Sequence, residues 1–319
     1  MLTHTILGAG GSIGKGLADI LIREKEQVRL VSRNPALLAG ADVFPADITD
    51  KPQALDAISQ SAIVYLCIGL KYDYAVWREQ WPKIMNNVIE ACKRTGAKLI
   101  FFDNVYMYGK VDGPMTEETP YNPISRKGDL RARLATQLMS EVRKENITAS
   151  IARAADFYGP GADKTSVPNL LVFTNLAKKK KAQWLANADV KHSFTYTPDA
   201  CRALYLMAKN EESWNQVWHL PTAANPLTGK EFIRMAAEAF GVSPDYMLLR
   251  PWLLRIIGFF NKQIAESIEM LYQSEYEYLF DSSKFEKAFG SQPTTYREGI
   301  FVTAAGFKKD FTLHYGNKE

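Results

Sequence analysis

Cysteine is scarce in this sequence, and the cysteines present have no spacing that suggests a shared role. Among 319 residues there are 3 cysteines, Cys67, Cys92 and Cys201. An odd number of widely separated cysteines excludes a disulfide framework and suits a reducing compartment, and no spacing of Cys or His is typical of a metal site. We therefore expect a cytoplasmic protein without a bound metal.

Long apolar runs are missing as well. The longest apolar stretch, residues 252–260, contains Arg255 and Gly258 and is much shorter than the roughly 20 apolar residues that cross a bilayer. The first residues begin a strand pattern at once, without the basic and apolar regions of a secretory signal. We expect no membrane partner, and we expect residues 252–260 to form a helix that is buried or contacts a second lobe.

A strong excess of one charge is also absent. The 39 Lys and Arg residues against 35 Asp and Glu give a formal net charge of +4. The conspicuous lysine run at residues 178–181 is interpreted as a solvated helix end, with a phosphate-attracting rim as the alternative. Nucleic-acid binding calls for a basic stripe beside exposed aromatics, which the sequence does not indicate. We expect a small-molecule substrate and no nucleic-acid partner.

What the sequence does contain is a regular alternation of two hydrophobic patterns. Short apolar runs typical of strands occupy residues 2–7, 28–32, 62–69, 97–102 and 148–152. Apolar residues recur at helical spacing from residue 13, over 51–60, from 81 to 91 and from 130 to 142. Apolar strands that alternate with helices form a parallel sheet covered on both faces. The sequence therefore predicts an α/β fold, a doubly wound parallel sheet of the Rossmann type.

The turn after the first strand is rich in glycine. Gly8, Gly11 and Gly14 give a G-x-x-G-x-x-G register, whereas the G-x-G-x-x-G register fails because position 13 is Ile13. Glycine lets the backbone turn sharply and approach phosphates, and the helix that begins near Ser12 offers unpaired N–H groups and a positive dipole end. Because the turn lies between a strand and a helix, we interpret it as a dinucleotide-binding turn.

The end of the second strand is the place where the adenosine ribose of a bound dinucleotide lies. Ser32 and Arg33 stand there, and no acid follows. A carboxylate would accept the 2′-hydroxyl of NAD, whereas a guanidinium pairs with the 2′-phosphate of NADP. This favours NADP as the cofactor, with NAD as the alternative. An exposed loop arginine without a ligand is the other interpretation of Arg33.

The order of these motifs resembles the extended short-chain dehydrogenase/reductase family, which includes nucleotide-sugar epimerases and dehydratases. The resemblance is carried by the glycine turn and by residues 47–49 (DIT), 67–69 (CIG), 108–109 (YG), 153–160 (RAADFYGP) and 192–199 (HSFTYTPD). It implies that Asp47 and Ile48 lie at the adenine. It also implies that Cys67 and Gly69 follow the strand beneath the cofactor.

The resemblance further implies two lobes that are interleaved in the sequence. Residues 1–160 with 192–221 would form the NADP-binding Rossmann domain. Residues 161–191 with 222–295 would form a smaller α/β substrate-binding lobe, and residues 296–319 a C-terminal helix or tail. The domain boundary is therefore expected not to be a single cut.

Members of this family normally carry a catalytic Ser or Thr and a Tyr-x-x-x-Lys pair on a helix. A phenol whose pKa is lowered by a nearby ammonium exchanges a proton with a substrate hydroxyl. In this sequence the corresponding positions hold Asn104, Lys127 and Arg131. All three have changed, so the usual proton path is missing.

Lys127 and Arg131 are four residues apart on an expected helix and should share one face. Two adjacent cations disfavour each other's charge, which favours proton release from the lysine. Our hypothesis is that Lys127 is a substitute proton donor and that Arg131 holds the ribose or an anionic substrate. A solvated basic helix start without any catalytic role is the alternative.

Tyr106 and Lys110 also have the Tyr-x-x-x-Lys spacing, but they leave a strand end through Gly109 instead of lying on a helix. We interpret that match as a coincidence, because residues four apart share a face only on a helix. Tyr106 and Tyr108 are individual candidates for proton transfer, with packing as the alternative for each. Asn104 can donate and accept hydrogen bonds and so orient a carbonyl, but it cannot act as an acid.

Two classes of function stay open on this evidence. The first is an atypical NADP(H)-dependent oxidoreductase or epimerase/dehydratase-like enzyme that acts on a sugar-like or small carbonyl or hydroxyl substrate. The second is a catalytically inactive dinucleotide-binding sensor or scaffold, since fold alone does not establish activity. A monomer or a homodimer is expected in either case.

Overall fold

The chain divides into two compact units. The computed structural model describes residues 3–315. Unit 1 comprises Met1–Gly109, Glu117–Ala154 and Ala200–Leu220, and unit 2 comprises Lys110–Thr116, Ala155–Asp199 and Pro221–Glu319. Position 2 of the expected first strand and residues 316–319 of the expected C-terminal tail lie outside the described residues.

The units change near residues 154 and 199, whereas the sequence placed the changes at 160 and 191. The difference arises because strand β8 (Asp156–Tyr158) pairs with strand β11 (Phe194–Tyr196), so both stay in unit 2. Helix α12 (Tyr296–Tyr315) also belongs to unit 2 and is not a separate segment. The functions assigned to the two lobes remain predictions.

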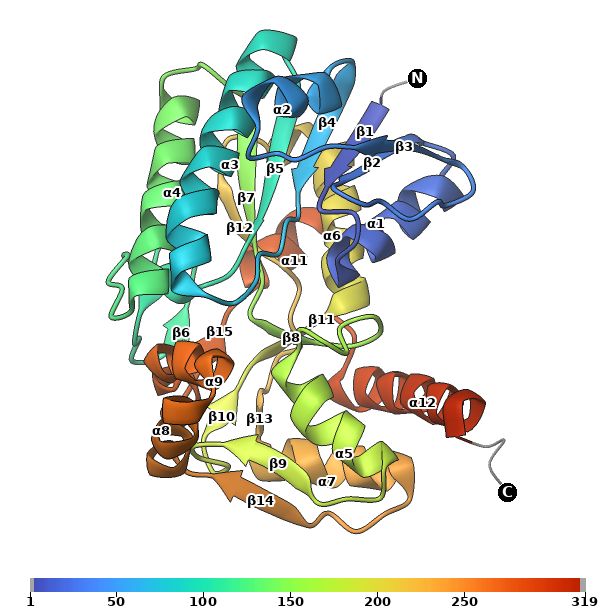
Figure 1. Ribbon diagram of the computed structural model, residues 1–319, viewed down its shortest axis with the longest axis vertical. Helices are drawn as coiled ribbons and strands as arrows, with labels where there is room; N and C mark the ends of the chain where they lie inside the picture. Colours follow the sequence, from blue (N-terminus) through green and yellow to red (C-terminus); the bar gives the residue numbers. More distant parts are fainter. Residues whose placement is uncertain (1–2, 316–319) are drawn as a thin grey trace. The chain divides into compact units, whose positions relative to one another are not determined.

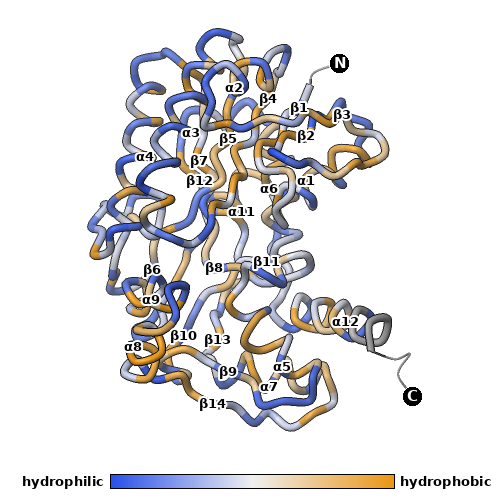
Figure 2. The backbone as a smooth tube through the Cα atoms, in the orientation of Figure 1, coloured by the Kyte–Doolittle hydropathy of each residue, from blue (hydrophilic) through white to orange (hydrophobic). Residues whose placement is uncertain are grey.

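Unit 1 is built on a seven-stranded sheet in the order β12-β7-β5-β4-β1-β2-β3. The strands are β1 (Thr3–Leu7), β2 (Gln27–Ser32), β3 (Ala41–Pro45), β4 (Ser61–Leu66), β5 (Lys98–Asp103), β7 (Ala149–Arg153) and β12 (Val217–His219). Every neighbouring pair is parallel. This confirms the doubly wound parallel sheet expected from the sequence (Figure 1), and hydrophobic residues line its central strands (Figure 2).

Helices flank this sheet. They are α1 (Ser12–Arg23), α2 (Lys51–Ile58), α3 (Tyr74–Thr95), α4 (Arg126–Arg143) and α6 (Thr197–Lys209). The first three residues of α6 belong to unit 2. Unit 1 also contains the short helical turns η1 (Tyr106–Tyr108) and η3 (Glu211–Ser213). From β1 the sheet is built outward in both directions, so right-handed crossovers place α1 on the face opposite α3 and α4. Helix α6 packs on α1 where Gly16 faces the Cys201 sulfur.

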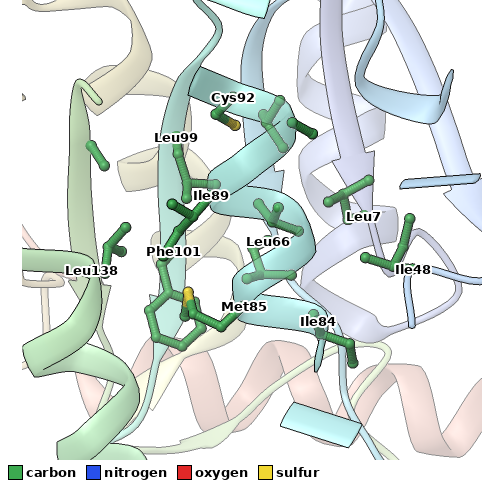
Figure 3. Close-up of a cluster of buried hydrophobic side chains, with 14 of the residues drawn as sticks. Leu7, Ile48, Leu66, Ile84, Met85, Ile89, Cys92, Leu99, Phe101 and Leu138 are labelled. Carbon is green, nitrogen blue, oxygen red and sulfur yellow. The ribbon is translucent and has the colours of Figure 1, made fainter. Parts of the chain in front are cut away.

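The local sequence explains where these helices begin and end. Asp50 accepts a hydrogen bond from the Gln53 N–H and caps α2, and Ser125 does the same for α4 through Gly128. Helix α3 ends at Gly96, which has a φ of 73°, as its sequence pattern indicated. Figure 3 shows the result, a core in which α3 side chains pack on the central strands.

One expected strand is shorter than predicted, and one strand was not predicted. The strand expected over residues 62–69 ends at Leu66, and Gly69 beyond it is exposed. Strand β3 was not expected, because it is a short edge strand in which none of the residues is fully buried, so it shows no apolar run.

Unit 2 is made of short elements around an aromatic core. Besides β8, β11 and α12, it contains β6 (Pro114–Met115), η2 (Asn169–Phe173), α5 (Thr174–Ala177), β9 (Ala182–Leu185), β10 (Lys191–His192), β13 (Leu227–Thr228), α7 (Gly229–Phe240), β14 (Tyr246–Leu249), α8 (Pro251–Phe260), α9 (Lys262–Ser267), η4 (Ile268–Met270), α10 (Tyr272–Glu275), β15 (Leu279–Phe280) and α11 (Ser283–Phe289). Tyr158, Phe173, Phe194 and Phe232 are buried against one another at its centre. Unit 2 therefore has a core of its own.

Helix α8 corrects one expectation. Residues 252–260 are helical, but Trp252, Ile256, Phe259 and Phe260 on this helix are exposed instead of buried. No helix within residues 3–315 is long and apolar enough to cross a membrane.

Gly109 provides a test of the backbone geometry after β5. Gly109 and Gly96 both have a positive φ, but only at Gly109 would a Cβ lie 2.0 Å from a backbone oxygen, that of Asn122. We expect Gly96→Ala to lower the free energy of unfolding by about 1–2 kcal/mol and Gly109→Ala by about 3 kcal/mol or more. Urea unfolding of both variants measures the difference, and equal losses would show that the close approach to Asn122 is not a constraint.

Candidate functional site

The glycine turn brings β1 and the residues after β4 very close together. Gly8 has a φ of 93°, and a Cβ there would lie 2.7 Å from the backbone of Ile68. A Cβ on Gly14 would lie 2.6 Å from the Gly8 carbonyl oxygen. Both positions therefore require glycine, and they hold the turn between the strand and the start of α1 in one shape.

The same turn leaves the helix N-terminus open. Gly11 caps α1 without any side-chain hydrogen bond, and Gly10 and Gly11 are exposed. No atom lies within 4 Å of where a Gly10 Cβ would stand. The first-turn N–H groups of a helix, here from Ser12 and Ile13, have no carbonyl partner inside the helix. The turn thus fits a pyrophosphate, which backbone N–H groups and the positive helix end would bind.

The residues expected at the adenosine end are ordered around Asp47. The Asp47 carboxylate accepts hydrogen bonds from the Thr49 N–H at 2.9 Å and the Thr49 hydroxyl at 2.7 Å. These hydrogen bonds, with a smaller effect of the Arg33 charge, lower the pKa of Asp47. The Ile48 carbonyl accepts a hydrogen bond from Asn87 on α3 at 2.9 Å. Arg33 follows β2 and is exposed, so it is available to an anionic ligand.

Cys67 and Gly69 lie where the central strand β4 ends. The Cys67 N–H donates to the Leu7 carbonyl at 2.9 Å, which ties this end to β1. Burial raises the pKa of the Cys67 thiol, so the thiol is neutral and not a nucleophile. Gly69 is exposed, and a Cβ there would meet no atom within 4 Å. This loop therefore offers open backbone, not a reactive side chain, beside the glycine turn.

A buried ion pair lies at the carboxyl end of β5. Arg131 on α4 donates through Nε, at 2.8 Å, and through Nη2 to one oxygen of Asp103. The guanidinium also lies over the rings of Trp81, at 4.5 Å, and Phe101, at 4.9 Å. The side chains of Asp103 and Arg131 are 0% and 4% exposed. We call Asp103, Arg131, Trp81 and Phe101, together with Lys127, the cation–aromatic cluster.

Lys127 completes this cluster one helical turn earlier. Its side chain is fully buried, and the ammonium lies 4.7 Å from the centre of the Tyr72 ring. Tyr72 contacts Trp77 edge to face, and Trp77 in turn contacts Trp81. Lys127 and Arg131 therefore lie against one continuous aromatic surface. Because Tyr72 belongs to the loop after β4, the ammonium is beside the carboxyl ends of the strands, not on a solvated helix start.

Asn104 and Tyr106 lie next to the cluster. The Asn104 side-chain oxygen accepts the Tyr106 N–H at 3.1 Å, which shapes the turn η1. The Tyr106 ring stacks on Trp77 with 6.4 Å between ring centres and is half-buried. A Cβ on Gly128 would lie 2.5 Å from the Tyr106 carbonyl oxygen, so η1 and the start of α4 pack closely. The structure thus brings together Asn104, Tyr106 and Lys127.

Tyr108 belongs to a different, buried network. Its hydroxyl accepts a hydrogen bond from Arg153 Nη1 at 2.6 Å and lies 2.7 Å from His219 Nε2. Arg153 also donates to the Tyr121 hydroxyl. Burial raises the pKa of Tyr108 to about 12, against the opposing effect of Arg153. The phenol therefore remains protonated near neutral pH, and its hydrogen bonds are made within unit 1.

The sequence did not single out Asp103. Its Oδ2 lies 3.8 Å from Arg153 Nε, so one buried carboxylate faces two arginines, from α4 and from β7. Neither Asp103 Oδ2 nor Arg153 Nε has a hydrogen-bond partner among the described residues. The sequence feature that could have identified Asp103 is its place as an acidic residue at the end of the apolar strand β5. His219 and Tyr121 carry no comparable pattern.

Comparison of the sequence with family models identifies the family. Residues 4–219 match the model of the NAD dependent epimerase/dehydratase family. The chain therefore belongs to that family, which confirms the resemblance drawn from the motifs. Comparison with curated proteins gave no match.

Solved structures of the same fold extend over nearly the whole chain. UDP-glucose 4-epimerase from Thermotoga maritima, with UDP-glucose, is 18% identical, covers 97% of this chain and 100% of its own, and has a TM-score of 0.80. UDP-glucose 4-epimerase from Thermus thermophilus, in complex with NAD, is 18% identical, covers 96% of this chain and 99% of its own, and has a TM-score of 0.78. A dTDP-glucose 4,6-dehydratase double mutant from Streptomyces venezuelae, with NAD bound, is 16% identical, covers 98% of each chain and has a TM-score of 0.80. These similarities show the fold.

Substitution of Asp103 tests the buried ion pairs. Asp103→Asn leaves Arg131 and Arg153 buried without a counter-charge, so we expect the free energy of unfolding to fall by about 3–5 kcal/mol. Asp42→Asn is the control, because Asp42 pairs with Arg29 while 62% exposed and should cost about 0–1 kcal/mol. Chemical denaturation measures both, and similar losses in the two variants would contradict the assignment.

Proposed function

We propose that the protein is an NADP(H)-dependent enzyme that acts at a carbinol or carbonyl carbon of a sugar-like or small substrate. The observation that carries this proposal is the open glycine turn at the start of α1, where Gly8 and Gly14 fit only without a Cβ and Gly10 and Gly11 stay exposed. A bound nicotinamide would supply the hydride exchange at the substrate carbon. The names of the similar structures, two epimerases and a dehydratase of nucleotide-linked glucose, support a sugar-like substrate.

In this proposal the two ends of the dinucleotide are held by different parts of unit 1. The first-turn N–H groups of α1 bind the pyrophosphate, and Asp47 and Ile48 line the adenine. Exposed Arg33, with Ser32, pairs with a 2′-phosphate and so selects NADP. NAD is the alternative cofactor, because two of the similar structures contain it. Asp47 opposes the Arg33 charge, which leaves the preference for NADP moderate.

Lys127 is the proposed proton donor. Its ammonium lies on the face of Tyr72 beside the strand ends, and a ring face stabilises a cation in a dry site. In this role the Lys127 ammonium transfers a proton to a substrate oxygen. Asp103 engages Nε and Nη2 of Arg131, which leaves Nη1 to hold a ribose hydroxyl or an anionic substrate group.

Asn104 and Tyr106 are proposed to orient the substrate, and Tyr108 to position the site. Tyr106 is half-buried over Trp77, so its phenol can reach a ligand at the strand ends. Tyr108 is 1% exposed and its hydroxyl is already hydrogen-bonded, so we assign it to fixing β7 and η1 and not to proton transfer.

A dinucleotide-dependent sensor is the second candidate. It is favoured by the prediction that Asn104, Lys127 and Arg131 replace the family's usual catalytic set, together with the observation that Lys127 and Arg131 are buried in the cation–aromatic cluster. Binding of NADPH without turnover of any substrate in a broad panel would support this candidate.

Cofactor binding is tested by thermal unfolding with NADPH and NADH. A ligand that binds only the native protein stabilises it by about 2.7 kcal/mol at a concentration of 100 Kd, so NADPH should raise Tm more than NADH. Arg33→Ser should reduce the NADPH shift to that of NADH, because the 2′-phosphate loses its partner. Arg143→Ser, an exposed arginine at the end of α4, is the matched control and should change neither shift.

No shift with either nucleotide would refute the dinucleotide site. A larger shift with NADH would refute the role of Arg33 and leave NAD as the cofactor.

The proton donor is tested by Lys127→Met, which keeps the length and apolar body of the side chain. Turnover is followed by NADPH absorbance with sugars, ketones and aldehydes, and kcat should fall about 100-fold or more while NADPH still raises Tm. Arg126→Met, the preceding and exposed residue, is the control. Unchanged turnover in Lys127→Met, with an unchanged Tm, would exclude Lys127 as the donor.

A further inference from the structure

Helix α8 in unit 2 carries an exposed apolar stripe. Trp252, Ile256, Phe259 and Phe260 are 57%, 55%, 85% and 83% exposed. Their spacing of four, three and one residues places them on one face of the helix. The hydrophobic colour of α8 is visible in Figure 2. Exposed aromatic side chains at this density mark an interaction surface.

The opposite face of α8 is packed against unit 2, which fixes the orientation of the stripe. Leu254 and Gly258 are buried. A Cβ on Gly258 would lie 3.2 Å from Ala265 Cα and 2.9 Å from Ile268 Cδ1, so α8 lies close to α9 and η4 there. The helix therefore cannot turn its outer face inward without losing this close contact. Helix α8 therefore has apolar residues on both faces, and its outer face would be covered only by an apolar surface that is not part of unit 2.

The charged residues on α8 and on the segments directly before and after it are basic. Residues 246–265 contain Arg250, Arg255 and Lys262 and no acid. All three are exposed, at the start, the middle and just beyond the end of α8. Acids begin again only at Asp245 on one side and Glu266 on the other. A partner that matches this surface is therefore apolar where it contacts the stripe and anionic where it contacts the basic residues beside the stripe.

We propose that α8 docks on an anionic phospholipid surface, with the helix lying in the headgroup region. Trp252, Phe259 and Phe260 would enter the acyl boundary, while Arg250 and Arg255 contact lipid phosphates. A helix with tryptophan and phenylalanine on one face and basic residues beside them is suited to this location. Docking on the surface needs no spanning helix, so it revises only the expectation that the protein has no membrane partner.

A second copy of the chain fits this surface less well. A twofold contact through the stripe would bring the central Arg255 of one copy near Arg255 of the other, and like charges oppose such an interface. Phe259 and Phe260 project at the end of the helix, where a rigid partner would need a matching pocket and a fluid lipid boundary would not.

Sedimentation of the full chain with vesicles tests the proposal. Vesicles of phosphatidylcholine with 30% phosphatidylglycerol are compared with phosphatidylcholine alone, at about 0.1 M and 0.5 M salt. We expect binding to the anionic vesicles only, weakened at high salt because screening reduces the contribution of the basic residues. Equal binding to neutral vesicles, or no binding to anionic ones, would overturn the proposal.

Matched variants locate the binding surface. The double variant Phe259→Ser with Phe260→Ser should lower the vesicle partition constant about tenfold or more, because apolar burial drives insertion. Leu37→Ser changes an apolar residue that is 89% exposed in unit 1 and should leave binding unchanged. Equal binding by the double variant would remove α8 from the interaction.

Two further measurements separate the proposal from its alternatives. Substitution at exposed positions should not change Tm, so an unchanged Tm shows that the double variant is folded. Sedimentation velocity without lipid should give the same mass for the wild type and the double variant. A wild-type dimer that the double variant converts to a monomer, together with no vesicle binding, would show that a second copy covers the stripe and would overturn the proposal.

Discussion

The buried carboxylate of Asp103 is the interaction on which the site of unit 1 depends. It stands at the carboxyl end of β5 and faces two cations, Arg131 from α4 and Arg153 from β7. Two cations and one anion in a dry interior have a large desolvation cost, which aromatic faces and hydrogen bonds must offset. Trp81 and Phe101 cover the first guanidinium, and Tyr108 hydrogen-bonds to the second. The aromatic content of this region follows from that requirement.

The same arrangement supports the proposal that Asn104, Lys127 and Arg131 stand where the family usually carries its catalytic residues. Arg131 pairs with Asp103, and Trp81 provides a flat surface for its planar guanidinium. Lys127, one turn earlier, then meets Tyr72 and is shielded from water. In our proposal these residues therefore act together in a site with a different charge distribution, and they are not a set of independent losses.

The sequence determined the fold more fully than the site. Most strands and helices of unit 1, though not the edge strand β3, follow from apolar runs, helical spacing and the residues that begin and end helices, such as Gly96, because each is a local property. The pairing of Asp103 with Arg131 and of Tyr108 with His219 joins residues far apart in the chain, and no local pattern specifies it. Residues 252–260 were expected to form a helix that is buried or contacts a second lobe because their composition is apolar, but composition does not tell which face of a helix finds a partner.

Lys127 shows how burial changes the interpretation of a charged motif. On the sequence, Lys127 and Arg131 are equally compatible with a solvated helix start and with a site. A solvated start would leave their side chains in water, where the ammonium costs nothing to keep charged. Both are instead buried against Tyr72, Trp77 and Trp81. This burial argues against a solvated helix start and supports our proposal that Lys127 donates the proton, while Arg131, held by Asp103, binds a ribose hydroxyl or an anionic substrate group.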